Sequence, residues 1–258
     1  MTYSDHLKTP LRLDLCSWKE VENYLTLCKG IILPIGSIEQ HGPTGAIGTD
    51  SMTAEAVALE VSKRSNVLMA PVQHYGMAEH HLGFPGTMSI KPSTLLALMH
   101  DLLCSLARNG FQRVFVINGH GGNIATLKAA FAESYKTILN SDEFHEKDFR
   151  CKLKNWFMVS EVFQKANELY GEMEGQHATP SEISLTLHLE PSLQEKQVPL
   201  PQPVPAGPIY SYKDFQKRYP DGRMGSDPYL AKSSHGKVFL DKAASTLTND
   251  LLNFLKEL

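Results

Sequence analysis

The chain has 258 residues, of which 42% are hydrophobic and 21% charged, proportions that are ordinary for a globular protein. A formal net charge of -3 offers no basic surface to a polyanion, so we expect no nucleic acid partner. No apolar run is long enough to span a bilayer, and the N-terminal stretch MTYSDHLKTPLRLDL lacks the apolar core of an export signal. We therefore expect a cytoplasmic protein that binds no membrane.

The four cysteines are also consistent with a cytoplasmic protein. Cys16, Cys28, Cys104 and Cys151 are widely scattered and form no C-x-x-C pair. This spacing indicates neither a disulfide framework nor a thiolate zinc site. We interpret them as reduced cysteines that mostly pack as small hydrophobic side chains.

Apolar runs and helical patterns alternate along the chain, which predicts an α/β protein with a mostly parallel sheet and helices on both faces. The expected strands are Gly30–Ile35, a second apolar run at Val67–Val72, Arg113–Ile117 and Leu153–Ser160. The expected helices are Ser17–Cys28, Asp50 to about Asn66, Ser93–Arg108, Ile124–Leu139, Glu161–Tyr170, Ser181–Leu189 and Gly236–Lys256. No break in composition or internal repeat divides the chain, so we expect a single domain over residues 1–258.

The first residues that carry chemistry follow the strand Gly30–Ile35. A glycine-rich loop there contains Glu39 and His41, and Asp50 stands where the next helix begins. Ligands of parallel α/β proteins bind beyond the carboxyl ends of the strands. Two carboxylates and an imidazole are ligands that zinc and manganese accept. The alternative is a solvated loop followed by an aspartate that caps the helix.

A second glycine-rich turn, Asn118–Asn123 (NGHGGN), follows the strand Arg113–Ile117 and places His120 between glycines. Gly119, Gly121 and Gly122 would let the backbone approach a ligand closely. Because loops after parallel strands emerge at one edge of the sheet, His120 could meet the residues of the first loop. The alternative is a structural histidine that is hydrogen-bonded to backbone.

The same turn could bind an anion through the amides at the start of the following helix. It contains neither G-x-G-x-x-G nor G-K-[ST], however, so it is no nucleotide fingerprint. Apart from Lys91 at the margin, no lysine or arginine adjoins the three candidate loops. A phosphate-handling enzyme is therefore disfavoured.

Four motifs together resemble the creatininase family of metal-dependent amidohydrolases. They are GSIEQHG at Gly36–Gly42 with the later Asp50, EHHLGFPGT at Glu79–Thr87, NGHGGN at Asn118–Asn123, and H-x-x-x-x-E-x-S at His177–Ser184. The resemblance covers most of the chain and includes the order of the motifs. It implies a three-layer α/β/α fold and two divalent metal ions per subunit, with zinc, manganese or iron as the expected metals.

The resemblance also implies roles for single residues. The metal ligands that it matches are Glu39, His41, Asp50, His120 and Glu182. Asp50 matches the carboxylate that bridges the two ions, and His177 matches a catalytic histidine beside them. The family further implies a homo-oligomer, which we expect to be a hexamer.

Departures from the family pattern concern the substrate. Gly121 and Gly122 stand where creatinine hydrolase proper has a tyrosine and a glutamate, and Ala78 stands where it has a serine that helps to hold creatinine. The plainer glycine pattern is shared by family members with other substrates. These include a formamide hydrolase acting on a flavin or deazaflavin precursor and a peptidase that trims a redox-cofactor precursor.

We therefore expect a hydrolase that cleaves a non-peptide C–N bond in a small amide, such as creatinine or a formamide. Two ions that share a carboxylate lower the pKa of a bridging water and polarise a carbonyl group. The leaving nitrogen needs a proton, which we assign to His177, with His80 as the second choice. We place Phe84, Gly121 and Gly122 with His80 in the substrate pocket. His74 and His81 either line that pocket or lie on the surface.

The residues alone leave other functions open. One is peptidase-like trimming of a cofactor precursor, and another is a mononuclear hydrolase in which Glu39 acts as the general base. A third is a metal-binding or ligand-binding protein without catalysis.

The proline-rich segment Pro191–Pro228 has no periodicity. We expect an extended strap with no core of its own, which lies on the surface or covers the site or a neighbouring subunit.

Overall fold

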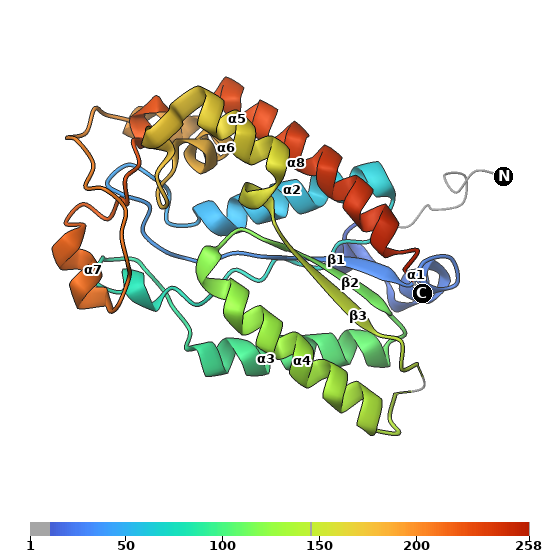
Figure 1. Cartoon of the computed structure of the whole chain (residues 1–258). Helices are drawn as coiled ribbons and strands as arrows, with labels where there is room; N and C mark the ends of the chain where they lie inside the picture. Colours follow the sequence, from blue (N-terminus) through green and yellow to red (C-terminus); the bar gives the residue numbers. More distant parts are fainter. Residues whose placement is uncertain (1–10, 145, 258) are drawn as a thin grey trace.

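A parallel sheet forms the centre of the computed structural model, which describes residues 11–144 and 146–257 (Figure 1). The strands β1 (Gly30–Ile35), β2 (Arg113–Asn118) and β3 (Arg150–Asn155) pair in the order β1-β2-β3. Every residue of β1 and β2 is buried. Burial on both faces explains why these two strands are recognisable as apolar runs.

The apolar run Val67–Val72 lies along the free edge of β1 but forms no continuous strand. The amide of Ile32 donates to the carbonyl of Leu68 at 2.9 Å, and the amide of Ala70 donates to the carbonyl of Ile32 at 2.8 Å. Isolated parallel bridges join Ile32 with Met69 and Ile35 with Gln73. This run therefore protects the edge of the sheet without adding a regular ladder.

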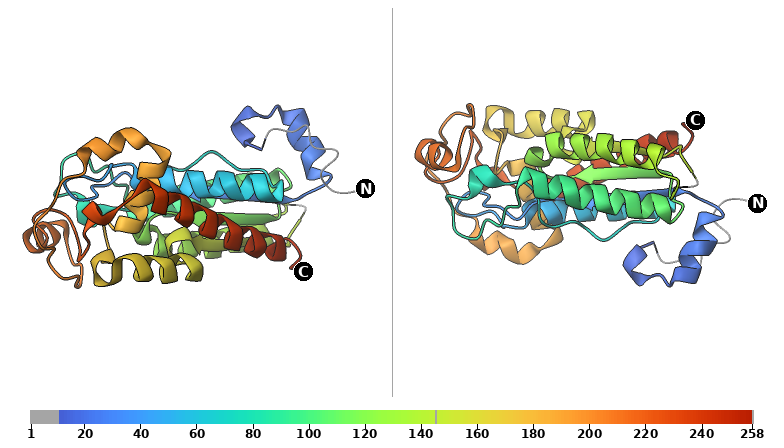
Figure 2. Two further views of the ribbon diagram at one scale, coloured as in Figure 1. Left: turned by 90° about the horizontal axis from the view of Figure 1, so that it is seen from above. Right: turned by 90° about the horizontal axis from the view of Figure 1, so that it is seen from below.

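Helices cover both faces of the sheet, which confirms the three-layer α/β/α fold (Figures 1 and 2). On one face lie α2 (Thr49–Ser65), α5 (Ser160–Tyr170), α6 (Pro180–Leu189) and α8 (Ser233–Phe254), and on the other α3 (Pro92–Arg108) and α4 (Ile124–Asn140). The short α1 (Trp18–Leu25) precedes β1, and α7 (Tyr212–Arg218) lies beyond the carboxyl ends of the strands. No helix in the described ranges is both long and apolar enough to cross a membrane.

Local sequence signals explain where several helices begin and end. The side chains and backbone amides of Ser17 and Glu20 form a reciprocal capping box at the start of α1. Pro92 occupies the first turn of α3, where its missing amide hydrogen costs no helical bond. Asn66 ends α2 in the left-handed conformation, with φ 56°.

The strand expected over Leu153–Ser160 is wrong by several residues. The structure has β3 at Arg150–Asn155, a 3-10 turn at Trp156–Met158, and α5 from Ser160. The half-buried β3 alternates basic and apolar residues, so it lacks the continuous apolar run of β1 and β2. Trp156 is fully buried and donates through Nε1 to the hydroxyl of Thr53. Because such buried positions take apolar side chains, the sequence of this turn resembles the continuation of a strand.

The proline-rich strap, Pro191–Pro228, was expected to lack a core, and this expectation is wrong. It contains α7 and a small cluster of Phe215, Tyr219 and Met224 against Phe84. Arg223 fixes the strap from within: it bonds to the carboxylate of Asp221 and to backbone carbonyl oxygens. The helix α7 packs against the 3-10 turn at Glu79–His81, so part of the strap covers the carboxyl end of the sheet.

Candidate metal centre

Four loops and helix ends bring the predicted ligands together at the carboxyl edge of the sheet. Ile35 pairs with Asn118 at the ends of β1 and β2, so the loops with Glu39, His41 and His120 leave side by side. Asp50 is the second residue of α2, whose N-cap is Gly48, so the alternative that it caps this helix is wrong. Glu182 comes from the first turn of α6.

The predicted ligands form two groups that share the carboxylate of Asp50, and a third candidate group, Glu39 with His81 and His177, adjoins them through Glu39. In the first group, His41, Asp50 and Glu182 each place an atom within 4.8 Å of the others, and in the second Glu39, Asp50 and His120 do the same. The Oδ1 atom of Asp50 lies 3.2 Å from His41 Nε2, and its Oδ2 atom lies 3.2 Å from His120 Nδ1. Asp50 therefore faces both groups, one oxygen to each, as a bridging carboxylate would.

Backbone hydrogen bonds orient the two imidazoles. His120 donates from Nε2 to the carbonyl of Met77 at 2.8 Å, which leaves Nδ1 facing Glu39 and Asp50. His41 donates from Nδ1 to the carbonyl of Glu39 at 3.1 Å, which leaves Nε2 facing Asp50 and Glu182. Metal-binding histidines are typically held in this way, with the distal N–H on an oxygen acceptor.

Unpaired buried atoms support a cation at this place. Among the described residues, Glu39 Oε2, His41 Nε2 and Asp50 Oδ2 are buried and have no hydrogen-bond partner. Buried polar atoms without a partner cost free energy and need an explanation. Because these are carboxylate oxygens and an imidazole nitrogen that face one another, the residues fit divalent metal ions.

The electrostatics of the ligand side chains point the same way. Burial raises the pKa of Glu39, and it raises the pKa of Glu182 to about 7. Burial opposes charge on His41, but the carboxylates of Asp50 and Glu182 outweigh it and raise its pKa to about 10. Burial likewise opposes charge on Asp50, but its imidazole neighbours hold its pKa below the ordinary value. Protonated imidazoles thus balance the negative charge of the carboxylates, which metal ions would otherwise balance.

The asparagines of the NGHGGN turn lock the loops to one another. Asn123 donates to the carbonyl of Gly36 at 2.9 Å and accepts from the amide of Met77 at 2.9 Å. Asn118 donates to the carbonyl of His120 and to the side chain of Asn155. These contacts fix the position of His120 relative to the first loop, which a precise metal site requires.

The three glycines of this turn do not all have the expected role. A Cβ atom at Gly119 would lie 2.2 Å from the carbonyl oxygen of Asp50, and one at Gly122 would lie 2.4 Å from His120 Nε2. These two glycines permit close packing of the ligand loops, and Gly122 also lies in the lining of the cavity described below. A Cβ atom at Gly121 meets nothing within 4 Å, so this position opens on free space.

A cavity of about 320 Å³ adjoins the ligands. Its lining consists of Glu39, His80, His81, His120, Gly121, Gly122, Gln176, His177, Ile209 and Met224. The structure thus brings together four of the predicted pocket and catalytic residues: His80, Gly121, Gly122 and His177. The volume suits a small molecule. Phe84 lies elsewhere, at an adjoining cavity of about 380 Å³ that Gln40 and Asp221 also line.

The two candidate proton carriers differ in their surroundings. His177 is buried beside the ligands, with Nδ1 3.6 Å from Glu39 Oε1 and Nε2 2.7 Å from the carbonyl oxygen of Gln40. Burial lowers its pKa well below the ordinary value. His80 is half-buried, and burial lowers its pKa to about 4. Of the two, only His177 has a polar contact to a ligand carboxylate among the described contacts, which favours it as the proton carrier.

Sequence reasoning did not identify Gln40 as part of the site, and it left His81 open between the pocket and the surface; the structure places His81 in the pocket lining. The surface alternative for His81 is wrong, because its side chain is 1% exposed and its ring lies 4.1 Å from that of His177. His74 is exposed, as its surface alternative expects. The available signals were the doubled histidine of EHHLGFPGT and the place of Gln40 between two ligands.

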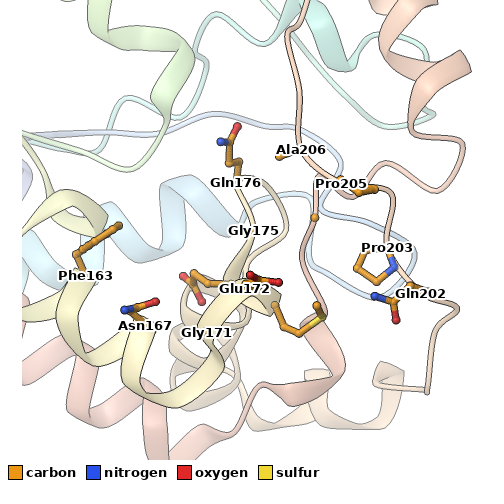
Figure 3. A pocket seen from close by; sticks show the side chains of 13 residues that line it. Phe163, Asn167, Gly171, Glu172, Gly175, Gln176, Gln202, Pro203, Pro205 and Ala206 are labelled. Atoms are coloured by element: carbon orange, nitrogen blue, oxygen red, sulfur yellow. The ribbon is translucent and has the colours of Figure 1, made fainter.

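A second cavity of about 450 Å³ lies next to the site (Figure 3). Residues of α5, of the 3-10 turn Gly171–Glu174 and of the strap line it, among them Phe163, Asn167, Glu172, Gln202 and Pro203. Gln176, one residue before His177, lines both cavities. The two cavities therefore have a common wall at Gln176.

Together, the fold and the site define a three-layer α/β/α protein with a candidate metal centre where its parallel strands end. A family model described as creatininase, creatinine amidohydrolase, matches residues 14–251. The chain belongs to the creatininase family.

The similar proteins are named for different activities. The chain is 34% identical over 136 residues to a mycofactocin precursor peptide peptidase of Mycolicibacterium smegmatis, with 50% of this chain and 53% of the relative covered. It is 28% identical over 142 residues to a 3-dehydro-scyllo-inosose hydrolase of Thermotoga maritima, with 53% and 46% covered. The match thus spans about half the length of these relatives. Identity to a creatinine amidohydrolase of Pseudomonas putida is 27% over 204 residues, with 75% and 77% covered.

Solved structures show the same fold. A crystal structure of creatinine amidohydrolase superposes with a TM-score of 0.84 at 24% identity, covering 96% of this chain and 99% of that one. A manganese form of creatininase superposes with a TM-score of 0.85 at 23% identity, covering 96% and 100%. At this level of identity the superpositions establish the fold.

Proposed function

We propose that this protein is a metal-dependent hydrolase that cleaves a non-peptide C–N bond in a small amide, such as a cyclic amide or a formamide. The observation that carries the proposal is the pair of ligand groups that meet at Asp50. Glu39 and His120 would hold one ion with Asp50, and His41 and Glu182 would hold the other. Two such ions, when bound, supply an activated water and polarise the carbonyl group.

The chain's own residues supply the remaining functions. His177 would carry a proton to the leaving nitrogen, because its ring borders both the cavity and Glu39. His80, Gly121 and Gly122 would contact the substrate from the cavity wall. Phe84 would not contact the substrate and would shape the pocket only indirectly, because its ring packs against Phe215. The moderate cavity volume supports a small amide as the substrate.

A second candidate is peptidase-like trimming of a cofactor precursor. Two observations favour it. Identity to a mycofactocin precursor peptide peptidase of Mycobacterium tuberculosis is 40% over 110 residues. In addition, the second cavity behind Gln176 offers room for a longer substrate than creatinine.

A substrate screen tests the proposal and its alternatives. Zinc-loaded and manganese-loaded protein is incubated with creatinine, formamides, lactams and short peptides, and loss of substrate and formation of the hydrolysis product are quantified by chromatography. We expect hydrolysis of at least one small amide, abolished in Asp50→Ala. Cleavage of peptides alone would favour the second candidate. No turnover of any compound by fully metal-loaded protein would favour a non-catalytic binding protein.

The metals, the assembly and the location stay predictions. Creatininase is known in a manganese form and in a Zn–Zn form, so we propose zinc or manganese here, with iron as the third choice. We further propose a cytoplasmic homo-hexamer in which the strap contacts a neighbouring subunit. Sedimentation at micromolar concentration checks the assembly, and a monomer would contradict it.

A further inference from the structure

Gln40, which stands between the ligands Glu39 and His41, has a side-chain amide with a fixed orientation. Its Oε1 accepts from the amide of Gly42 at 2.8 Å, and its Nε2 donates to the carbonyl of Gly222 at 2.9 Å. If the amide were flipped, its NH₂ group would face the N–H of Gly42 and its oxygen would face the carbonyl of Gly222, so only one orientation fits. Gly222 is closely fitted to the amide, since a Cβ atom there would lie 2.1 Å from Gln40 Oε1.

This orientation decides where His81 carries its hydrogen. The Gln40 amide has two hydrogens, of which one is used by Gly222 and the other points to His81 Nδ1 at 2.9 Å. Nδ1 of His81 must accept, so in the neutral ring the hydrogen lies on Nε2. That nitrogen lies 3.4 Å from Glu39 Oε1, inside a site where both side chains are 1% exposed.

The two oxygens of Glu39 thereby face different partners. Its Oε2 lies 3.2 Å from His120 Nδ1, within the group of candidate metal ligands. Its Oε1 lies on the other side, near His81 Nε2 and His177 Nδ1. An N–H directed at Oε1 from 3.4 Å would stabilise the carboxylate electrostatically while Oε2 faces a metal ion, the task of outer partners of metal-binding carboxylates.

The backbone of Gln40 decides where His177 carries its hydrogen. Nε2 of His177 lies 2.7 Å from the Gln40 carbonyl oxygen, which can only accept, so Nε2 must donate. The 3.0 Å approach of Gln40 Nε2 to the same nitrogen is then a contact between two donors. Nδ1 of His177 is left with a lone pair, 3.6 Å from Glu39 Oε1.

We propose that Gln40 and His81 are positioning residues: Gln40 fixes the hydrogens of His81 and His177 on their Nε2 atoms, and His81 uses its own to hold the ligand Glu39. This inference rests on the proposed function and identifies the atom of His177 that carries the proton in it. Nδ1 of His177 takes the proton of the attacking water, forming an N–H bond beside Glu39 Oε1. The same N–H bond breaks when the proton passes to the leaving nitrogen, so His177 ends as it began.

Nitrogen NMR of the zinc-loaded protein reads these positions directly. Protein is labelled with ¹⁵N-histidine, the two rings are assigned from His81→Gln and His177→Gln, and protonated ring nitrogens are told from bare ones by shift. We expect both rings to carry hydrogen on Nε2 alone. Gln40→Met should make part of the His81 rings carry hydrogen on Nδ1, because the donor facing Nδ1 is lost, whereas Gln197→Met, which removes the amide bonded to Thr44, should not. Hydrogen on Nδ1 of His81 in the unsubstituted protein, or an unchanged His81 in Gln40→Met, would overturn the proposal.

A pair of substitutions at His81 tests the contact to Glu39 without relying on Gln40. Glutamine places an amide N–H near the position of Nε2, whereas asparagine reaches only the position of Nδ1. His81→Asn should weaken the binding of zinc by about 10–100-fold, the usual effect of losing an outer hydrogen bond. His81→Gln should keep the affinity within a few-fold of the unsubstituted protein, measured by competition with a chromophoric chelator.

Equal losses in both variants would assign His81 a packing role only, and no loss in either would remove it from the site. Neither measurement uses a substrate. A protein with these hydrogen positions that hydrolyses no amide would therefore contradict the proposed function and leave the positioning role standing.

Discussion

Replacing Glu182 by glutamine should separate two functions of one side chain. Its Oε1 accepts from the backbone amide of Thr179 and completes the capping box of α6, while its Oε2 faces His41 Nε2 at 3.8 Å. A glutamine oxygen can keep the first contact. Its NH₂ group cannot bind a metal ion, so the second function is lost.

The magnitude follows from the number of ligands. Loss of an outer partner of a metal ligand costs about 10–100-fold in affinity, so loss of one of three protein ligands should cost at least about 100-fold, or about 2.8 kcal/mol. Titration of metal-free protein with zinc against a chelator should show one weakened site in Glu182→Gln. The far-UV spectrum should be unchanged, because α6 keeps its cap.

Thr179→Ala is the matched control. It removes the hydroxyl that accepts from the amide of Glu182 but keeps the Thr179 backbone amide that Glu182 needs. It should cost about 1 kcal/mol of folding stability and leave zinc affinity within a few-fold. Two tight sites in Glu182→Gln, or an equal loss of zinc in Thr179→Ala, would refute this assignment.

Glu182 also predicts how the metal-free protein responds to pH. Its pKa is raised by burial from 4.5 to about 7, so between these values the folded state binds more protons than the unfolded state. Stability should therefore fall as pH rises through this window, by at most about 3 kcal/mol from this group. Glu182→Gln should flatten the fall in urea titrations of metal-free protein. A variant with the slope of the unsubstituted protein would contradict the raised pKa of this carboxylate.

Two further predictions concern proton transfer and metal-linked stability. His177→Ala should keep its metal content and lose about 10²–10⁴-fold in turnover of an amide, with a smaller loss on an activated ester whose leaving group needs no proton. Equal losses on both substrates, together with missing metal, would make His177 a ligand. Zinc at 100 times its dissociation constant should stabilise the fold by about 2.7 kcal/mol, which corresponds to a rise in Tm of about 5–10 °C. An unchanged Tm in a thermal scan would mean that the folded state does not bind zinc selectively.

Local signals in the sequence predicted most of the fold. The strands β1 and β2 are apolar runs because both of their faces are covered, and helix ends such as Asn66 and Pro92 carry their own start and stop residues. The basic residues of the half-buried β3 hide its pattern, and its position was wrong for that reason. The strap was misjudged because only Phe215 and Tyr219 of its core have helical spacing, on the short α7 and at its C-cap, while Met224 joins them across a turn.

The candidate metal ligands were found through motif order, which places Asp50 and Glu182 in one site although they are far apart in the chain. The positioning contacts had no comparable signal. Gln40 meets Gly222 across 182 positions and His81 across 41, and such pairings leave no periodic trace in a single sequence. The difference is physical: a strand or a cap depends on near neighbours, whereas a hydrogen-bond network depends on the finished fold.

The metal content of Asp50→Ala tests the central claim most directly. Asp50 faces both ligand groups, so its loss should empty both, whereas the exposed Asp101→Ala should keep the full content. Each protein is reconstituted with zinc, freed of excess metal and measured by elemental analysis. The account predicts two ions per chain in the unsubstituted protein and in Asp101→Ala, and close to none in Asp50→Ala. Two tightly held ions in Asp50→Ala, or a single ion in the unsubstituted protein, would contradict it.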